Sequence, residues 1–255
     1  MVKKILRGFI ILFSIMALAG CATTYNPATG RNEIILISSS TEVSLGQKVI
    51  PQLLKEYPLS DDSGLQKRLE SIGSRIAEVC DRQDIGYKFS VLKNKELNAL
   101  TIPGGFIYVN EGLMKVLNDD ELAYVVAHEA GHTAARHIVK KIQSSMAYQL
   151  ILTAAFAGLG GDSGGAASAL SAVDTVYGLV QLSYSRKDEY EADRLGAKYA
   201  LRSGFDPYAS ILALEKIKKE EGPNWKVLGY FRTHPYADER IAALKKFIPE
   251  LKNSK

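Results

Sequence analysis

Hydrophobic residues recur at helical spacing along most of the chain. Between residues 64 and 80, Leu65, Leu69, Ile72 and Ile76 fall on one face of a helix. Capping residues, and the prolines and glycines that stop helices, bound the other helical stretches. We therefore expect helices over residues 38–57, 64–80, 118–144 and 185–203, and two more that begin near residues 206 and 235.

The pattern changes between residues 87 and 110. The apolar residues Tyr87, Phe89 and Val91 alternate with polar ones, which predicts a half-buried strand. The runs "LNALTI" and "FIYV", separated by the break "PGG", predict two more strands of a small antiparallel sheet. One small sheet among long helices indicates an α+β fold that is mainly helical.

The first twenty residues have the features of a signal peptide. A basic start precedes "FIILFSIMALAG", which is shorter than the about 18 to 20 apolar residues needed to span a bilayer. The following "LAGC" resembles the bacterial lipobox, and this resemblance implies cleavage before Cys21 and lipid on that cysteine. The alternative is an ordinary secreted protein. We expect a signal peptide over residues 1–20, a lipidated tether over 21–38 and a single domain over 39–255.

Charge argues against a nucleic-acid partner. Without the three basic residues of the signal peptide, the 32 of the whole chain fall to 29, against 28 acidic residues. No cationic surface is therefore indicated. Once Cys21 carries lipid, Cys80 has no partner for an intramolecular disulfide, and its apolar-periodic surroundings predict that it is buried.

The segment "AYVVAHEAGHTAARH", residues 123–137, places two histidines four residues apart. On a helix, His128 and His132 stand one above the other, and Glu129 lies about 100° round the axis. A zinc site uses this arrangement for two ligands and an adjacent base. The alternative is a helix that carries two histidines and no metal.

A second predicted helix offers carboxylates. The stretch "SRKDEYEAD" places Glu189 and Asp193 four residues apart on one face. A catalytic zinc takes three protein ligands, and two histidines with one carboxylate form a known set. Glu189 would complete that set, and Asp193 would accept a hydrogen bond from a ligand histidine. Spacing alone leaves Glu191 open as the third ligand.

With these motifs the chain resembles the HtpX and CaaX-prenyl-endopeptidase group of zinc metallopeptidases, and within it the short bacterial lipoprotein members. The segments that carry the resemblance are "YNPATGR", "NALTIPGGFIYVNEGLM", "HEAGH", "SRKDEYEADRLG", and "THP" followed by Arg240. The resemblance implies a zincin-like metalloprotease domain, with its small sheet beside the HExxH helix, and one Zn²⁺ per chain.

The resemblance also assigns individual residues. It selects Glu189 over Glu191 as the third ligand. It matches His234 to a histidine that can occupy the open metal position as a reversible plug, and Arg240 to the arginine that accompanies it. The alternative for His234 is a residue at a helix start without metal contact. His137 has no counterpart, and we expect it at the surface or behind the ligands.

Together these residues predict a zinc-dependent endopeptidase. Glu129 would be the catalytic base. An edge strand over residues 98–102, with Asn98 and Ala99 supporting the site or the substrate, would pair with extended polypeptide. Such pairing reads the backbone, so we expect unfolded, misassembled or membrane-associated envelope proteins as substrates. One alternative is a zinc-stabilised lipoprotein chaperone or assembly factor with little proteolysis; a metal-free binding module would need both motif helices to be coincidental.

Location follows from the predicted lipid. Cys21 would tether the protein to a bacterial membrane. Ala22 is not the aspartate that favours retention at the inner membrane, so in a Gram-negative host we expect the periplasmic face of the outer membrane. The glycine-rich segment 158–172 is either a linker or a lid over a cleft.

Overall fold

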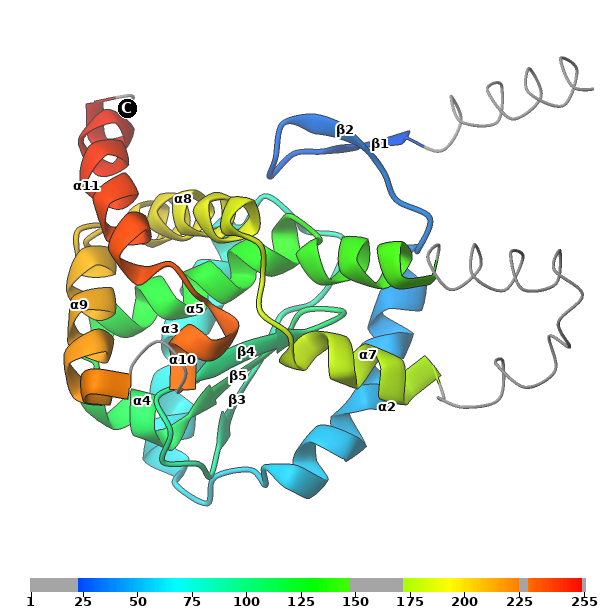
Figure 1. Ribbon diagram of the computed structural model, residues 1–255, viewed down its shortest axis with the longest axis horizontal. Coiled ribbons are helices and arrows are strands. Elements are labelled where there is room, and N and C mark those ends of the chain that lie inside the picture. The colour runs from blue at the N-terminus through cyan, green and yellow to red at the C-terminus, as the bar shows by residue number, and fades with distance from the viewer. Residues whose placement is uncertain (1–22, 147–171, 225–228, 254–255) are drawn as a thin grey trace, which may run out of the picture.

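The computed structural model describes residues 23–146, 172–224 and 229–253 (Figure 1). The predicted signal peptide over residues 1–20, Cys21, and residues 158–171 of the glycine-rich segment lie outside this part of the chain. In chain order the elements are β1 (Thr23–Asn26), β2 (Arg31–Ile34), α2 (Ser39–Glu56), α3 (Ser63–Val79), β3 (Lys88–Leu92), β4 (Ala99–Ile102), β5 (Phe106–Asn110), α4 (Glu111–Val116), α5 (Asp119–Ala134), the helical residues 137–146, α7 (Ala172–Gln181), α8 (Arg186–Arg202), α9 (Ala209–Glu221), the short 3-10 helix η1 (Gly222–Asn224), α10 (Gly229–Thr233) and α11 (Ala237–Asn253).

The central sheet has the strand order β3-β5-β4. β4 and β5 form an antiparallel hairpin whose turn contains Gly104 and Gly105, both with positive φ. β3 pairs with β5 in parallel, so the expectation of a wholly antiparallel sheet is wrong at this pair. The tight turn after β4 reverses the chain and inserts β5 between the other strands, so that β5 runs in the direction of β3. The mainly helical α+β class is confirmed.

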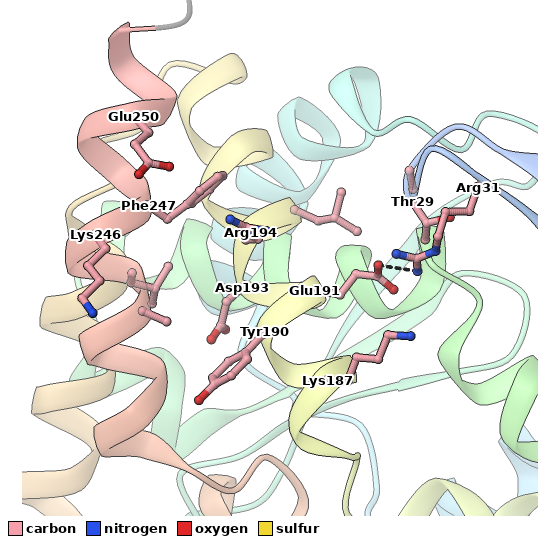
Figure 2. Close-up of a pocket in the computed structure, with 14 residues that line it drawn as sticks. Thr29, Arg31, Lys187, Tyr190, Glu191, Asp193, Arg194, Lys246, Phe247 and Glu250 are labelled. Atoms are coloured by element: carbon pink, nitrogen blue, oxygen red, sulfur yellow. Dashed lines mark hydrogen bonds and ion pairs between the residues drawn. The ribbon is translucent and has the colours of Figure 1, made fainter.

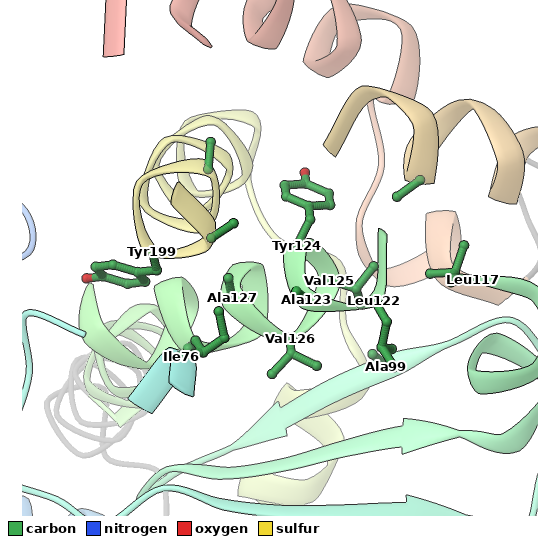
Figure 3. Close-up of a cluster of buried hydrophobic side chains, with 14 of the residues drawn as sticks. Ile76, Ala99, Leu117, Leu122, Ala123, Tyr124, Val125, Val126, Ala127 and Tyr199 are labelled. Carbon is green, nitrogen blue, oxygen red and sulfur yellow. The ribbon is translucent and has the colours of Figure 1, made fainter. Parts of the chain in front are cut away.

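Helix α5 lies at the centre of the domain, between the sheet and α8 (Figure 1). Every residue from Glu121 to Ala134 is buried. Its apolar residues belong to a hydrophobic core shared with α3, α8, α9 and α11 (Figure 3). Cys80 is buried in the same core, as expected. A second core packs the sheet against α2, residues 137–146 and α7.

The HExxH helix is shorter than the pattern predicts. We expected one helix to about residue 144, but α5 ends at Ala134, and Arg136 adopts a positive φ of 57° before helix resumes at residue 137. The left-handed residue changes the direction of the chain. His137, five positions after His132, therefore faces that histidine across the break.

The stretch assigned to the tether contains a β-hairpin. Its strands β1 and β2 pair antiparallel, with Thr23 opposite Ile34 and Asn26 opposite Arg31. The hairpin lies at one end of the molecule (Figure 1). Within the described ranges, no helix combines the length and apolar character that crossing a membrane requires.

Candidate metal centre

Two glycines set the close approach of α5 and α8. A Cβ atom on Gly131 would lie 3.0 Å from the carbonyl oxygen of Ala192, and one on Gly196 would lie 3.0 Å from the backbone nitrogen of His128. Both distances are below ordinary van der Waals separation. The absence of side chains at Gly131 and Gly196 thus lets the helix with the histidines touch the helix with the carboxylates.

The close packing brings four possible ligands together. One donor atom from each of His128, His132, Glu189 and His234 lies within 4.8 Å of the others, and all four side chains are buried. The Nε2 atom of His132 lies 3.4 Å from Oε1 of Glu189. The Nδ1 atom of His234, which comes from the loop between α10 and α11, lies 3.2 Å from the same oxygen.

The outer nitrogen of His128 is fixed by Asp193. The Nδ1 atom of His128 lies 2.9 Å from Oδ1 of Asp193 and donates its proton to the carboxylate. The hydroxyl of Tyr124 donates to the same oxygen at 2.6 Å. Asp193 thereby holds the His128 ring with its Nε2 atom turned towards the other possible ligands.

Arg240 neutralises the carboxylates of α8 from the far side. Its guanidinium donates to both oxygens of Asp193, at 2.9 and 2.7 Å, and its Nη1 atom lies 2.7 Å from Oε2 of Glu189. Burial by itself would raise the pKa values of Glu189 and Asp193, but Arg240 and the neighbouring histidines hold both below their ordinary values. Both groups are therefore carboxylates.

The outer nitrogen of His132 is fixed by His137. Their Nδ1 atoms lie 2.8 Å apart, and Nε2 of His137 lies 3.1 Å from Oε2 of Glu191. Glu191 in turn accepts a hydrogen bond from Arg31 at 2.6 Å. Because the Glu191 carboxylate is an acceptor, His137 carries its proton on Nε2 and accepts at Nδ1 the proton of His132. Glu191 therefore lies behind the donor cluster rather than in it, and His137 is buried.

These contacts provide a test of whether a metal fits. With protons on both outer nitrogens, the Nε2 atoms of His128 and His132 are two acceptors that face each other at 3.0 Å. Burial, with Arg240 nearby, lowers the pKa of His128 to about 4, and burial also lowers that of His132. Two facing lone pairs require a cation, and bonds of about 2.0–2.1 Å in a tetrahedron separate ligand atoms by about 3.3 Å. The donor set fits a tetrahedral metal such as zinc.

Glu129 lies beside the cluster, within ion-pair distance of His234. It is completely buried, and neither carboxylate oxygen has a hydrogen-bond partner. The Nε2 atom of His234 lies 3.3 Å from Oε1 of Glu129, and the backbone of Thr101 is near enough to lower the pKa of the carboxyl group. Burial raises the pKa of Glu129 to about 7, although His234 opposes the rise. A carboxylate with this pKa can both take and give a proton at neutral pH.

Aromatic rings close the site. Tyr184 stacks on His132 with 3.9 Å between ring centroids, and Tyr230 stacks on His234 at 4.5 Å. A hollow of about 670 Å³ lies on the other side of α8, between α11 and the β1–β2 hairpin (Figure 2). None of the four possible ligands lines this hollow; Glu191 and Asp193 of α8 do, and Glu191 pairs with Arg31 there. The donor cluster is thus shielded in this conformation.

Asn98 and Ala99 lie where β4 begins, and both are buried. The backbone nitrogen of Asn110 donates to the carbonyl of Asn98, and antiparallel pairing alternates along the strand. The backbone groups of Ala99 and Thr101 therefore point to the unpaired edge of β4. The side chain of Asn98 accepts a hydrogen bond from the Ala99 amide at 2.9 Å, and Thr101 contacts Thr133 of α5 through its hydroxyl.

The profile of Peptidase family M48 matches residues 63–248. The chain belongs to peptidase family M48. This finding confirms the expected metallopeptidase family, and the described cluster supplies possible metal ligands.

Several M48 relatives are similar over most of the chain. Mitochondrial metalloendopeptidase OMA1 of Schizosaccharomyces pombe is 31% identical over 230 residues, which are 89% of this chain and 66% of that protein. The Beta-barrel assembly-enhancing protease of Escherichia coli is 28% identical over 223 residues, 85% of this chain and 45% of that protein. The chain thus spans between about half and two thirds of the length of these relatives.

A solved structure shares the fold. The crystal structure of S. mikatae Ste24p matches with a TM-score of 0.50 and 18% sequence identity, covering 79% of this chain and 55% of that one. At this identity the match shows the fold alone.

The place of His137 behind His132 was one of two alternatives expected from the sequence, whereas the stacking of Tyr184 and Tyr230 was not predicted. The role of His137 depends on the left-handed Arg136, which no local pattern indicates. The stacking of Tyr184 on His132 joins residues 52 positions apart, and that of Tyr230 on His234 joins residues four positions apart across the end of α10. A possible signal was the short spacing between His132 and His137 in "HEAGHTAARH".

Proposed function

We propose that this protein is a zinc-dependent endopeptidase that hydrolyses peptide bonds of unfolded or misassembled envelope proteins. The observation that carries the proposal is the pair of facing Nε2 atoms of His128 and His132, 3.0 Å apart, with the buried Glu129, whose oxygens make no hydrogen bond, beside them. Burial of these polar groups lowers the stability of the fold unless a bound cation compensates them. Buried titratable groups of this kind cluster at functional sites.

His128, His132 and Glu189 would hold the ion. Zn²⁺, when bound there, would polarise the scissile carbonyl and lower the pKa of the attacking water. Glu129 takes the proton of that water on a carboxylate oxygen and passes it to the leaving amine. Its raised pKa suits both steps. Asp193 and His137 keep the two ligand rings in the orientation and tautomer that present Nε2.

The free edge of β4 would position the substrate. The amide of Ala99 is bound by the side chain of Asn98, but the carbonyl of Ala99 and the backbone groups of Thr101 lie at the unpaired edge of β4, where an extended peptide can pair with them. Backbone pairing places few demands on side chains. This supports a broad preference for unfolded segments over folded proteins.

His234 would act as a reversible plug. Its Nδ1 atom lies 3.4 Å from Nε2 of His128, and its Nε2 atom lies 3.3 Å from Glu129, so one ring covers both a metal position and the base. Substrate can therefore reach the site only when the loop that carries His234 moves away. We expect His234→Ala to raise peptide cleavage several-fold while zinc stays bound.

The closed site also favours a second function, a zinc-stabilised chaperone or assembly factor that cleaves rarely. The names of the bacterial relatives refer both to assembly and to proteolysis. Cells in which the Glu129→Gln variant replaces the wild-type protein distinguish between the two functions. If a folded, zinc-loaded Glu129→Gln variant replaces the wild type, assembly rather than cleavage is the main activity.

The principal test uses the mature chain purified with and without zinc. Glu129→Gln keeps the volume and hydrogen-bonding shape of the side chain but removes the base, so casein cleavage should fall at least about 100-fold with zinc content unchanged. Glu220→Gln, an exposed residue of α9, is the matched control and should cleave normally. If Glu129→Gln cleaved casein as fast as the wild type does, the mechanism would be refuted. Glu189→Ala should lose the zinc itself.

We also propose lipid attachment at Cys21 and, in a Gram-negative host, a location at the periplasmic face of the outer membrane. The "LAGC" motif and Ala22 support it. Labelling with an alkyne palmitate should mark the wild type and not Cys21→Ser. Label on Cys21→Ser would show that the lipid, if any, is elsewhere.

A further inference from the structure

The β1–β2 hairpin turns its polar face towards the domain. The side chain of Asn26 donates to the carbonyl of Ala134 at the end of α5, Glu33 accepts from Lys140 at 2.7 Å, and Arg31 pairs with Glu191 of α8. Asn26 and Arg31 are cross-strand partners, and Glu33 is two residues from Arg31, so these residues share one face. Hydrogen bonds and ion pairs attach the strands of the hairpin to the domain, and Ala28 in its turn packs against the main core.

The opposite face is exposed, and it carries the large apolar side chains of Tyr25 and Ile34 beside the polar residues Thr23 and Asn32. Tyr25 and Ile34 lie on it by register, and their exposed fractions are 61% and 56%. The alternation continues beyond β2, where Leu36 is 72% exposed while Ile35 and Ile37 contribute to the second core. A hairpin that packs on a domain normally buries its apolar face and exposes the polar one. Here the large apolar side chains Tyr25, Ile34 and Leu36 stand on the exposed side instead, an arrangement found at surfaces that bind a partner or a membrane.

The exposed face is held in place. The side chain of Gln143 accepts hydrogen bonds from the backbone amides of Leu36 and Ile37 and donates to the carbonyl of Ile34. Met146, one turn beyond Gln143, is also exposed. The exposure of Leu36 is therefore set by specific contacts rather than by fraying of the strand.

The position of Cys21 indicates what covers this face. Cys21 precedes Thr23 by two residues, a reach of at most about 7 Å. Lipid on Cys21 would therefore hold the start of β1 at the level of the headgroups. Aromatic and large aliphatic side chains partition into that layer, and binding grows with the apolar area that they bury.

We propose that Tyr25, Ile34 and Leu36 insert into the boundary between headgroups and acyl chains of a phospholipid bilayer, beside the lipid on Cys21. The occupant rests on the proposed lipidation, whereas the proposed proteolysis plays no part in it. Since Arg31 and Asn26 tie the hairpin to α8 and to the end of α5, insertion would also fix the orientation of the metal centre relative to the membrane.

The test places an environment-sensitive fluorophore on single introduced cysteines. Leu36→Cys and Ile34→Cys report on the hairpin, and Leu212→Cys, 53% exposed on α9, is the matched control at the other end of the molecule (Figure 1). The probe is phosphatidylcholine vesicles into which the lipidated chain is reconstituted. Burial raises the pKa of Cys80 to about 12, so only the introduced thiol reacts.

On vesicles, emission from positions 34 and 36 should shift to shorter wavelength and be quenched by acyl-brominated lipid, whereas emission from position 212 should match that in buffer. If the labels at positions 34 and 36 showed the same emission wavelength and the same lack of quenching as the control label, the proposal would be overturned. A dry label in detergent-free buffer without vesicles, accompanied by a dimer in light scattering, would assign the face to a second copy and would also overturn it. No part of this experiment measures peptide cleavage. A negative result would therefore count against membrane insertion without counting against the proposed proteolysis.

Discussion

The Nδ1 atoms of His132 and His137 lie 2.8 Å apart, across the break that a left-handed Arg136 makes after α5. This contact gives each ring a defined proton. His132 donates, His137 accepts, and the other nitrogen of His137 donates to Glu191. His132 is thereby held with its free lone pair towards Glu189.

We predict that His137→Ala weakens zinc binding by about 10- to 100-fold, the usual effect of losing the partner of a ligand histidine. His137→Gln retains an acceptor oxygen and should recover part of the affinity. Competition with a chromophoric chelator measures both, and circular dichroism checks the fold. Equal zinc affinity in His137→Ala and wild type would mean that the contact does not orient His132.

Replacement of Arg240 should destabilise the domain strongly. Arg240→Met leaves the buried carboxylates of Glu189 and Asp193 without their cation, which should lower the free energy of unfolding by about 3–5 kcal/mol. Chemical denaturation of the metal-free protein measures the loss. Arg202→Met removes an exposed ion pair with Asp81 and is the control, with an expected cost of at most about 1 kcal/mol. Similar losses in both variants would contradict the assigned role of Arg240.

Gly46 of α2 should not tolerate a side chain. A Cβ atom there would lie 1.9 Å from the carbonyl oxygen of Pro103, in the turn between β4 and β5. Gly46→Ala should therefore cost about 1–3 kcal/mol despite the better helix propensity of alanine. Gly178→Ala in α7 meets no atom within 4 Å and should stabilise slightly. Thermal unfolding compares the two, and a Gly46→Ala variant as stable as Gly178→Ala would show that the turn can yield.

Attachment of the hairpin should weaken in acid. Burial would raise the pKa of Glu33, but hydrogen bonds from Lys140, Asn26 and Thr29 outweigh it and lower the pKa below its ordinary 4.5. The carboxylate therefore stabilises the attached hairpin above pH 4.5, and this contribution disappears as the pH falls through the lowered value. Hydrogen exchange of the β1 and β2 amides should accelerate over that range. Glu33→Gln should already exchange faster at pH 7 and show a weaker acid response.

Local patterns located the helices of the site correctly. Histidines four residues apart on α5 and carboxylates four apart on α8 need only helical periodicity, which the sequence contains within one or two turns. The mainly helical α+β class, the buried Cys80 and the strands β4 and β5 followed in the same way. Periodicity could not reveal that β3 runs parallel to β5, because strand order depends on contacts between distant segments.

The sequence by itself therefore determined which residues could form a metal site and on which elements they lie. Tertiary structure decided how they meet. Contact between α5 and α8 at Gly131 and Gly196 brings Glu189 to the histidines, the positive φ of Arg136 returns His137 to His132, and packing of the loop before α11 places His234 between Glu189 and Glu129. The physical reason is range: helical spacing is fixed over a few residues, whereas close packing and a single left-handed residue act between segments that only the folded chain brings together.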